Sequence, residues 1–391
     1  MFIRIVKSYD YSLIAAVFAL SAFGLVMVYS SSMITSILRY EVTSSYFFQK
    51  QSLSLFIGTA AFIVIAIIPY KLFLQKGIIK LLFYGTIGSL LVVFVFGHTA
   101  GNAQSWIKLG GMAIQPAEFA KMWVIIYLSA LLAKKQRYMD DFGHAILPPV
   151  IFVVIVFVLI LIQPDFGTAL ILLLNAFIVL LCSGMTLRSF MRLFVFSIAA
   201  AGLGLLLLYV SDKLADVFSP ERISRFTGFM DPFENMADSG YQLVSSYFAI
   251  SSGGVAGLGL GNSIQKYGYL PESHTDFIMA VISEELGIIG VLIVIGLLAF
   301  IVLKGFLISR SCKDPFGSLL AIGISSMIGI QSVINLGAVA GLLPITGVTL
   351  PFVSYGGSSL ILLCIAAGML VNISMMNKFK ETYQVENKAA A

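Results

Sequence analysis

Long apolar stretches separated by short polar connections run along the chain from residue 11 to residue 376. About 20 apolar residues in a helix cross a hydrocarbon core roughly 30 Å thick, because each residue adds about 1.5 Å. Ten stretches reach or approach this length, so the pattern predicts an all-α, polytopic membrane protein. The expected membrane helices cover residues 11–31, 49–69, 78–97, 116–133, 148–163, 166–183, 190–210, 275–303, 317–340 and 357–376.

A polar interruption, Gln163-Pro164-Asp165, separates the fifth apolar stretch from the sixth. Proline lacks a backbone donor and keeps the preceding residue out of the helical region. We therefore expect a tight hairpin here, with Asp165 well placed to cap the helix that follows.

Composition and charge agree with a membrane protein. Hydrophobic residues make up 59% of the 391 and charged residues 11%, against about 45–50% and about 25% in soluble domains. Most of the 24 Lys and Arg residues fall in connections that place both termini in the cytoplasm, by the positive-inside rule. Residues 211–274 then form a large extracellular loop, and residues 377–391 a cytoplasmic tail. The net charge of +5 reflects this bias and does not indicate nucleic-acid binding.

Two segments of the long loop have patterns of their own. SGYQLVSSYFAISSGG (239–254) has apolar residues at helical spacing, which predicts an amphipathic helix lying on the membrane or folding back into it. GGVAGLGLG (253–261) follows no predicted strand and does not spell a dinucleotide fingerprint. Its glycines favour close backbone packing or a hinge.

Ionisable residues crowd the start of the eighth expected helix, in YLPESHTDFIMAVISEELG (269–287). A helix over 275–303 would be about 43 Å long, so its first turns stand above the outer surface. Asp276 has two interpretations there. Ser273-His274-Thr275-Asp276 fits a helix-capping pattern, and a carboxylate at the surface can act as a general base. Glu284 and Glu285, near the interface, are the next candidates for the base.

Three residues near the fourth expected helix pose a similar choice. Lys121 lies within the helix, where a cation indicates a functional site, and Glu118 at i−3 is its natural partner. A purely structural ion pair is the alternative. Trp106, in GNAQSWIKLGG, is either a functional residue or a member of the interfacial aromatic belt.

Several blocks resemble the SEDS family of bacterial cell-wall polymerases, which act in shape, elongation, division and sporulation. The form TLPFVSYGGSS, with Thr349 before Leu350-Pro351, is similar to the division branch or its sporulation relative. The SYDYSLI start is similar to division members of Gram-positive rods. The blocks extend over essentially the whole chain: GLVMVYSSS (24–32), AQSWIKLGGMAIQPAEFAK (103–121), QPDFGT (163–168), RFTGFMDPF (225–233), LPESHTDFIMAVISEELG (270–287) and GLLPITGVTLPFVSYGGSS (341–359).

The resemblance implies a peptidoglycan glycosyltransferase that polymerises lipid II at the outer face of the cell membrane and releases undecaprenyl pyrophosphate. The family's proposed catalytic base maps onto Asp276, and its functional Trp and Lys map onto Trp106 and Lys121. Many relatives have a basic residue just before that Trp, where this chain has Gln104 and Ser105. The other expected substrate-binding residues are Glu118, Arg222, Arg225, Gln242, His274 and Ser354.

The resemblance also implies partners. They are a class B penicillin-binding protein, which is a transpeptidase, and other membrane proteins of the divisome. The small residues Gly323, Ser325, Ser326 and Gly329 are either a surface for the partner's membrane helix or internal packing. No cofactor is assigned and no residue is named as a metal ligand. A divalent cation, Mg²⁺ or Mn²⁺, bridging phosphate and the loop acids is left open.

Two other functions stay open at this point. A lipid II flippase would need ionisable groups along a path through the membrane midplane, whereas this chain gathers them at the outer surface. A scaffold that only recruits a transpeptidase would require neither Asp276 nor Lys121.

Overall fold

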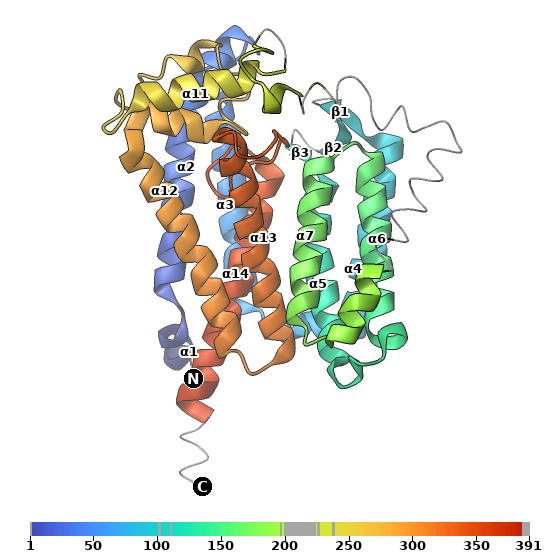
Figure 1. Cartoon of the computed structure of the whole chain (residues 1–391). Helices are drawn as coiled ribbons and strands as arrows, with labels where there is room; N and C mark the ends of the chain where they lie inside the picture. Colours follow the sequence, from blue (N-terminus) through green and yellow to red (C-terminus); the bar gives the residue numbers. More distant parts are fainter. Residues whose placement is uncertain are drawn as a thin grey trace, which may run out of the picture.

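The computed structural model describes residues 2–100, 103–109, 112–195, 198, 224, 227–236 and 239–384. Long helices form a bundle whose two ends differ (Figure 1). One end carries the strands and the transverse helix α11, and it is called the α11 end. The other carries both chain termini and is called the termini end. The long helices are α2 (Tyr11–Leu38), α3 (Tyr46–Ile67), α4 (Lys76–Phe96), α5 (Pro116–Lys134), α6 (Leu147–Ile162), α7 (Phe166–Cys182), α12 (Ile278–Ser311), α13 (Pro315–Val339) and α14 (Gly357–Phe379).

Nine of the ten expected membrane helices lie in the described part of the chain. Eight helical segments there are long and apolar enough to cross a membrane, and α7 is a shorter apolar helix of 17 residues. The expected helix 190–210 lies mostly outside the described residues, although residues 187–195 are helical. The expected start of the eighth helix at residue 275 is wrong, because the chain makes turns until α12 begins at Ile278.

Shorter elements complete the structure. They are α1 (Phe2–Ser8), α11 (Tyr241–Gly253), the 3₁₀ turns η1 (Tyr70–Leu74), η2 (Gln136–Tyr138) and η4 (Gln265–Tyr267), and the π turns η3 (Phe142–Ile146) and η5 (Lys380–Gln384). An antiparallel sheet of β1 (His98–Ala100), β2 (Ala103–Leu109) and β3 (Met112–Ile114) joins α4 to α5. The all-α prediction missed this sheet because strands of three to seven residues carry too little alternation to be recognised.

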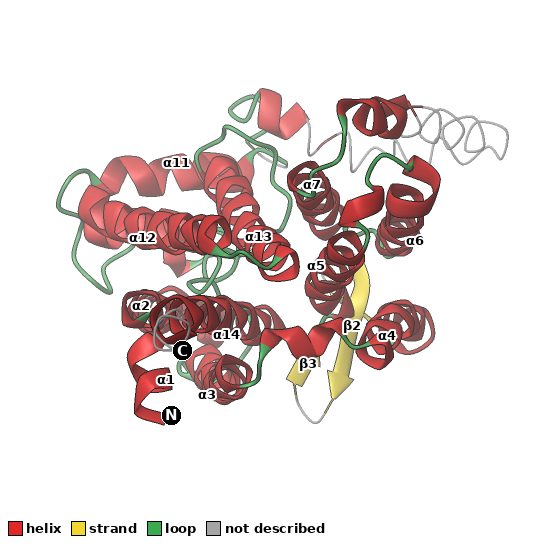
Figure 2. Ribbon diagram, turned by 90° about the horizontal axis from the view of Figure 1, so that it is seen from below, coloured by secondary structure: helices red, strands yellow, loops and turns green. Residues whose placement is uncertain are grey.

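Two hydrophobic cores hold the bundle together. The larger joins α2, α3, α12, α13 and α14 and includes residues of α5. The smaller joins α4, α5, α6 and α7. Figure 2 shows the two groups along the bundle axis, with α5 and α13 between them. Gly323, Ser325 and Ser326 of α13 are buried, and a Cβ at Gly323 would overlap Ile125 of α5. Internal packing is therefore the correct interpretation of these three residues, whereas Gly329 is half-buried beside Val302 of α12.

The hairpin and cap expected at residues 163–165 are confirmed. α6 ends at Ile162, α7 begins at Phe166, and the Asp165 side chain accepts a hydrogen bond from Thr168 N at 3.1 Å. The hairpin between α6 and α7 lies at the α11 end of the bundle (Figure 1).

Helix α12 breaks at Gly287, whose φ of 63° is a conformation that glycine adopts readily. At this break, backbone N–H groups of the loop after α11 donate hydrogen bonds to carbonyl groups of α12 that have lost their helical partners. Leu258 N donates to Glu284 O, and Gly259 N donates to Glu285 O, each at 2.9 Å. A Cβ at Gly257 would overlap Glu285 O. The glycines of residues 253–261 thus serve close backbone packing.

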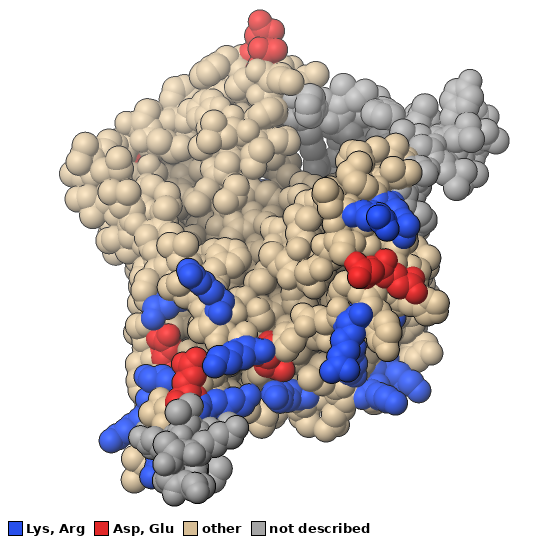
Figure 3. Space-filling view, turned by 60° about the horizontal axis from the view of Figure 1, so that its bottom comes forward, with Lys and Arg blue, Asp and Glu red and all other residues tan. Residues whose placement is uncertain are grey.

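Basic side chains gather on the termini end of the bundle (Figure 3). The exposed ones there include Arg4, Lys7, Lys71, Lys76, Lys80, Lys134, Arg137, Arg188, Arg192, Arg310, Lys313 and Lys378.

Candidate active site

Asp276 lies in the turn before α12, at the α11 end. It is partly exposed. The capping interpretation does not hold, because the N-cap of α12 is Phe277 and no side chain caps that helix. Among the described residues, the Asp276 carboxylate has no hydrogen-bond partner. It faces a glycine, since a Cβ at Gly347 would lie 3.6 Å from Asp276 Oδ2. The carboxylate is therefore oriented by its backbone and free to accept a proton.

Burial raises the pKa of Asp276 to about 7, and the negative charge of Glu272 adds to this shift. Glu272 is itself held in the same turn, where its carboxylate accepts from Thr275 Oγ1 at 2.8 Å and lies 3.9 Å from Arg39 of α2. A carboxyl group with a pKa near neutral can take up and release a proton at physiological pH. Asp276 thus has the properties of a general base.

The loop of residues 344–356 holds the backbone that carries Asp276. Ser354 Oγ donates to Thr275 O at 2.6 Å and accepts from Leu350 N at 2.8 Å. Tyr355 N donates to His274 O at 2.9 Å. These contacts give Ser354 a positioning role, and its direct contact with substrate stays a prediction.

His274 is 2% exposed and packs between two aromatic rings. Its ring centroid lies 4.3 Å from that of Phe47 and 5.7 Å from that of Tyr355. Burial lowers the pKa of His274 to about 4, so the ring is neutral. A neutral, enclosed imidazole supports the turn before α12, and substrate contact by His274 stays a prediction.

A second polar group lies at the start of α5. Lys121 Nζ is 2.8 Å from Glu118 Oε1, and the side chains are only 2% and 9% exposed, so the expected pair is confirmed. Gln115 precedes α5 and donates from Nε2 to Asp165 Oδ2 at 2.6 Å. Burial raises the pKa of Asp165, and the charges of Glu118 and Lys121 also act on it. Two carboxyl groups and one ammonium therefore share this site.

The loop of residues 344–356 and the first turn of α14 connect the two polar groups. A Cβ at Gly167, near the start of α7, would lie 2.6 Å from Thr346 O, while the next residue of the loop faces Asp276. Gln115 N donates to Ser358 Oγ at 3.4 Å. The turn of Asp276, the start of α5 and the start of α7 thus all contact residues 344–358.

Four expected site residues remain. Trp106 lies in β2, opposite His98 of β1, and its side chain is half-buried. Gln242 lies in the first turn of α11 and is half-buried. Arg222 and Arg225 lie outside the described residues. Substrate contacts by these four side chains stay predictions.

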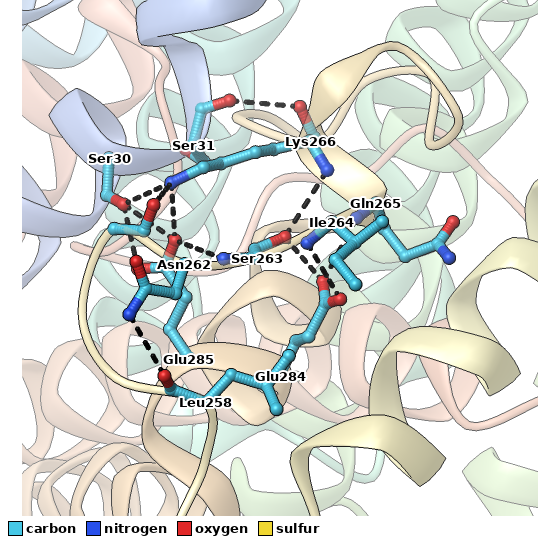
Figure 4. Close-up of polar contacts among 12 residues, drawn as sticks. Ser30, Ser31, Leu258, Asn262, Ser263, Ile264, Gln265, Lys266, Glu284 and Glu285 are labelled. Atoms are coloured by element: carbon cyan, nitrogen blue, oxygen red, sulfur yellow. Dashed lines mark hydrogen bonds and ion pairs between the residues drawn. The ribbon is translucent and has the colours of Figure 1, made fainter.

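Glu284 and Glu285 have a structural role that sequence reasoning missed (Figure 4). Glu284 accepts hydrogen bonds from Ser263 Oγ and from Ile264 N, the latter at 2.9 Å. Glu285 pairs with Lys266 at 2.8 Å and accepts from Ser30 Oγ of α2. Both glutamates are at most 1% exposed. They bind the loop after α11 to α12, and because both carboxylates are buried and hydrogen-bonded, they are not placed to act as the base.

The described residues contain no group of three or more His, Cys, Asp or Glu side chains that could hold a metal ion. Glu272 and Asp276 alone offer two carboxylates in one turn, fewer protein ligands than a dedicated Mg²⁺ or Ca²⁺ site provides. A divalent cation bound mainly by substrate phosphate stays a prediction.

These motifs and this geometry have known counterparts. The family model of FtsW, RodA and SpoVE, described as "Cell cycle protein", matches residues 11–379. The chain belongs to this family. It is the family of shape, elongation, division and sporulation proteins expected from the sequence.

Curated relatives match over nearly their whole lengths. "Probable peptidoglycan glycosyltransferase FtsW" of Bacillus subtilis (strain 168) is 56% identical over 379 residues, covering 97% of this chain and 93% of the relative. "Stage V sporulation protein E" of the same organism is 36% identical over 372 residues, covering 95% and 98%. The division protein is the more similar of these two.

Solved structures share the fold. One, described as "Structural coordination of polymerization and crosslinking by a peptidoglycan synthase complex", superposes with a TM-score of 0.73 at 25% identity and covers 94% of this chain and 98% of that one. A crystal structure of a mutant of the rod shape determining protein RodA of Thermus thermophilus gives a TM-score of 0.63 at 25% identity, covering 94% and 97%. The chain therefore has a RodA-like fold over the 94% of its length that these structures cover.

Proposed function

We propose that the protein is a peptidoglycan glycosyltransferase of cell division, which polymerises lipid II into glycan strands at the outer face of the cytoplasmic membrane. Family membership and the 56% identity to a protein named as such a glycosyltransferase support the activity. The greater similarity to that division protein than to the sporulation protein supports the role in septal wall synthesis.

The observation that carries the mechanism is the Asp276 carboxylate. It is partly exposed, oriented toward Gly347, and has a pKa of about 7. In the reaction, the 4-hydroxyl oxygen of the acceptor sugar attacks the anomeric carbon of the donor and forms the new glycosidic bond. The bond from that carbon to the pyrophosphate oxygen breaks, and undecaprenyl pyrophosphate leaves. Asp276 accepts the hydroxyl proton, a contribution of about 10²–10⁴-fold in rate.

The leaving pyrophosphate needs positive charge to stabilise it. Lys121 supplies this charge only in part, because Glu118 lies 2.8 Å from its ammonium group. Arg222 and Arg225 are the further candidates. In this proposal, the Glu118–Lys121 pair orients sugar or phosphate oxygens, while the arginines add the charge that the pair lacks.

The proposed orientation places the α11 end outside the cell. The gathering of Lys and Arg side chains at the termini end supports it (Figure 3), because cytoplasmic connections carry the excess of basic residues. Asp276 and the start of α5 then lie where the sugars and phosphates of lipid II meet the membrane surface.

The proposed partner is a class B penicillin-binding protein. A neighbour with the same fold was solved in a complex that both polymerises and crosslinks peptidoglycan, and crosslinking is the transpeptidase's reaction. The part of α12 that follows the break at Gly287 offers an apolar surface for a partner's membrane helix. Its exposed side chains include Ile288, Ile289, Leu292, Ile293 and Leu303.

Reconstitution with purified lipid II tests this function against the two alternatives. Parent protein and Asp276→Asn would be placed in liposomes, with and without the transpeptidase, and assayed for glycan strands and for transfer of lipid II between leaflets. We expect strands from the parent and almost none from Asp276→Asn. Transfer between leaflets without strands would establish a flippase, and strand formation that needs the partner but not Asp276 would establish a scaffold.

A further inference from the structure

One buried amide connects the turn that carries Asp276 to the loop that borders its carboxylate. Asn335 lies in α13 and is 2% exposed. Its Nδ2 donates to Asp276 O at 2.8 Å and to Val348 O at 2.7 Å. An amide group has two such protons, so both are used. Val348 follows Gly347, the residue that faces the Asp276 carboxylate.

We propose that Asn335 is a positioning residue for glycosyl transfer. Its amide fixes the separation between Asp276 and residues 346–348, the part of the loop beside which the acceptor hydroxyl must approach the base. Asn335 acts through Asp276 and does not touch substrate. The inference rests on the proposed function, because it assigns Asn335 a role in that reaction.

Three consecutive carbonyl groups show how the base is held. The oxygens of residues 274–276 accept hydrogen bonds in turn from Tyr355 N, Ser354 Oγ and Asn335 Nδ2, at 2.9, 2.6 and 2.8 Å. The first two donors belong to the loop itself. The third belongs to α13 and ties the Asp276 end of this row to the helical bundle, while Gln51 of α3 bonds the loop at Ser354 O and Gly356 N. Without the Asn335 amide, Asp276 could shift relative to residues 346–348 although the rest of the loop stays bonded to the bundle.

A second amide on the same face of α13 holds the next residue of the loop. Gln331 lies one turn before Asn335 and donates from Nε2 to Thr349 O at 3.0 Å. Asn335 Oδ1 is buried and has no partner among the described residues. The NH₂ group of Asn335 therefore makes both contacts with the site. A side chain without a donor should lose the hydrogen bonds to Asp276 O and to Val348 O.

The chain contains a matched control for this contact. Asn175 of α7 is 3% exposed, donates from Nδ2 to Gly323 O at 2.8 Å and to Ser326 Oγ at 3.0 Å, and has a buried Oδ1 without a described partner. It thus matches Asn335 in burial and hydrogen bonding, but it joins two helices and does not contact the turn of Asp276. Replacing each with leucine removes the same groups.

The experiment compares Asn335→Leu and Asn175→Leu with the parent, in liposomes containing lipid II. Turnover at saturating lipid II, the KM and the midpoint of thermal unfolding are measured for each. We expect Asn335→Leu to lose about 10- to 100-fold in turnover, as expected for misplacement of a reacting group by about 1 Å. Its KM should stay within about threefold. Asn175→Leu should lower the thermal midpoint to a similar extent while keeping turnover within about threefold.

Equal turnover losses in the two leucine variants would overturn the proposal, because the role would then be structural. If Asn335→Leu cannot be purified, the turnover of Asn335→Gln tests the proposal instead. This variant keeps the amide group but displaces it by one methylene. Full turnover in that variant would also overturn the proposal. A parent protein that makes no glycan would instead refute the proposed function, so the two failures are distinguishable.

Discussion

Lys266 Nζ and Glu285 Oε1 lie 2.8 Å apart, and both side chains are fully buried. Ser30 Oγ of α2 contacts both of them, at 3.2 Å from Lys266 and 2.8 Å from Glu285. Its neighbour Ser31 accepts a hydrogen bond from Ser273, three residues before Asp276. One turn of α2 therefore supports both the ion pair and the segment that carries the proposed base.

Removing the cation of this pair should destabilise the protein. Lys266→Met leaves Glu285 buried without its positive partner, a change that typically costs about 3–5 kcal/mol. We expect a clear fall in the midpoint of thermal unfolding in detergent. The double variant Lys266→Met/Glu285→Gln, which removes both charges, should recover much of the loss. A midpoint equal to the parent's in Lys266→Met would show that the pair does not support the fold.

A side chain at Gly347 should slow polymerisation. A methyl group there would lie 3.6 Å from Asp276 Oδ2, and the φ of 73° is unfavourable for other residues, by roughly 1–2 kcal/mol. We expect Gly347→Ala to polymerise lipid II at least about tenfold more slowly than the parent, because the methyl group narrows access to the carboxylate. Gly77→Ala, where nothing lies within 4 Å of the added carbon, is the control and should keep full activity. Equal rates in the two variants would exclude this role for Gly347.

The helices could be predicted from the sequence because their signal is local. Nearly every expected apolar stretch is a helix in the described structure, and Asp165 caps α7 as its position between Pro164 and the next apolar run indicates. The start of α12 was placed too early because Thr275 and Asp276 continue a plausible helical pattern. The turn there is instead set by backbone contacts to Tyr355 and Asn335.

The residues that hold the site could not be predicted, because their partners are distant in sequence. His274 looks polar and exposed in a loop, yet Phe47 and Tyr355 enclose it. From the sequence, Glu285 was expected near the membrane interface as a further candidate for the base. In the structure it forms an ion pair with Lys266 and accepts a hydrogen bond from Ser30. Lys121 was the exception, since its partner Glu118 lies on the same helix at a spacing that brings side chains together.

A single and a double variant separate a structural role of the Glu118–Lys121 pair from a role in the reaction. Lys121→Met should reduce both stability and polymerisation, because it leaves Glu118 buried without a cation. Glu118→Gln/Lys121→Met should recover stability. If the pair takes part in the reaction, the double variant should still polymerise lipid II at least about tenfold more slowly than the parent. Recovery of both thermal midpoint and rate would make the pair purely structural.

The pH dependence of polymerisation should follow the Asp276 carboxyl group. A general base works only when deprotonated, so with a pKa of about 7 the rate should rise as the pH increases through 7 and level off above it. Burial is the larger cause of this raised pKa and the negative charge of Glu272 the smaller.

Glu272→Gln tests whether the charge of Glu272 helps to raise the pKa of Asp276. It removes that charge but keeps an acceptor for Thr275 Oγ1. Ionisation of Asp276 then becomes easier, its pKa falls, and the midpoint of the pH–rate curve should move to lower pH by up to about one unit. The variant would therefore keep more of its activity at pH 6 than the parent does. Asp140→Asn, in an exposed position at the termini end, should leave the curve unchanged. An unmoved midpoint in Glu272→Gln, or a shift to higher pH, would mean that the titrating group is not Asp276.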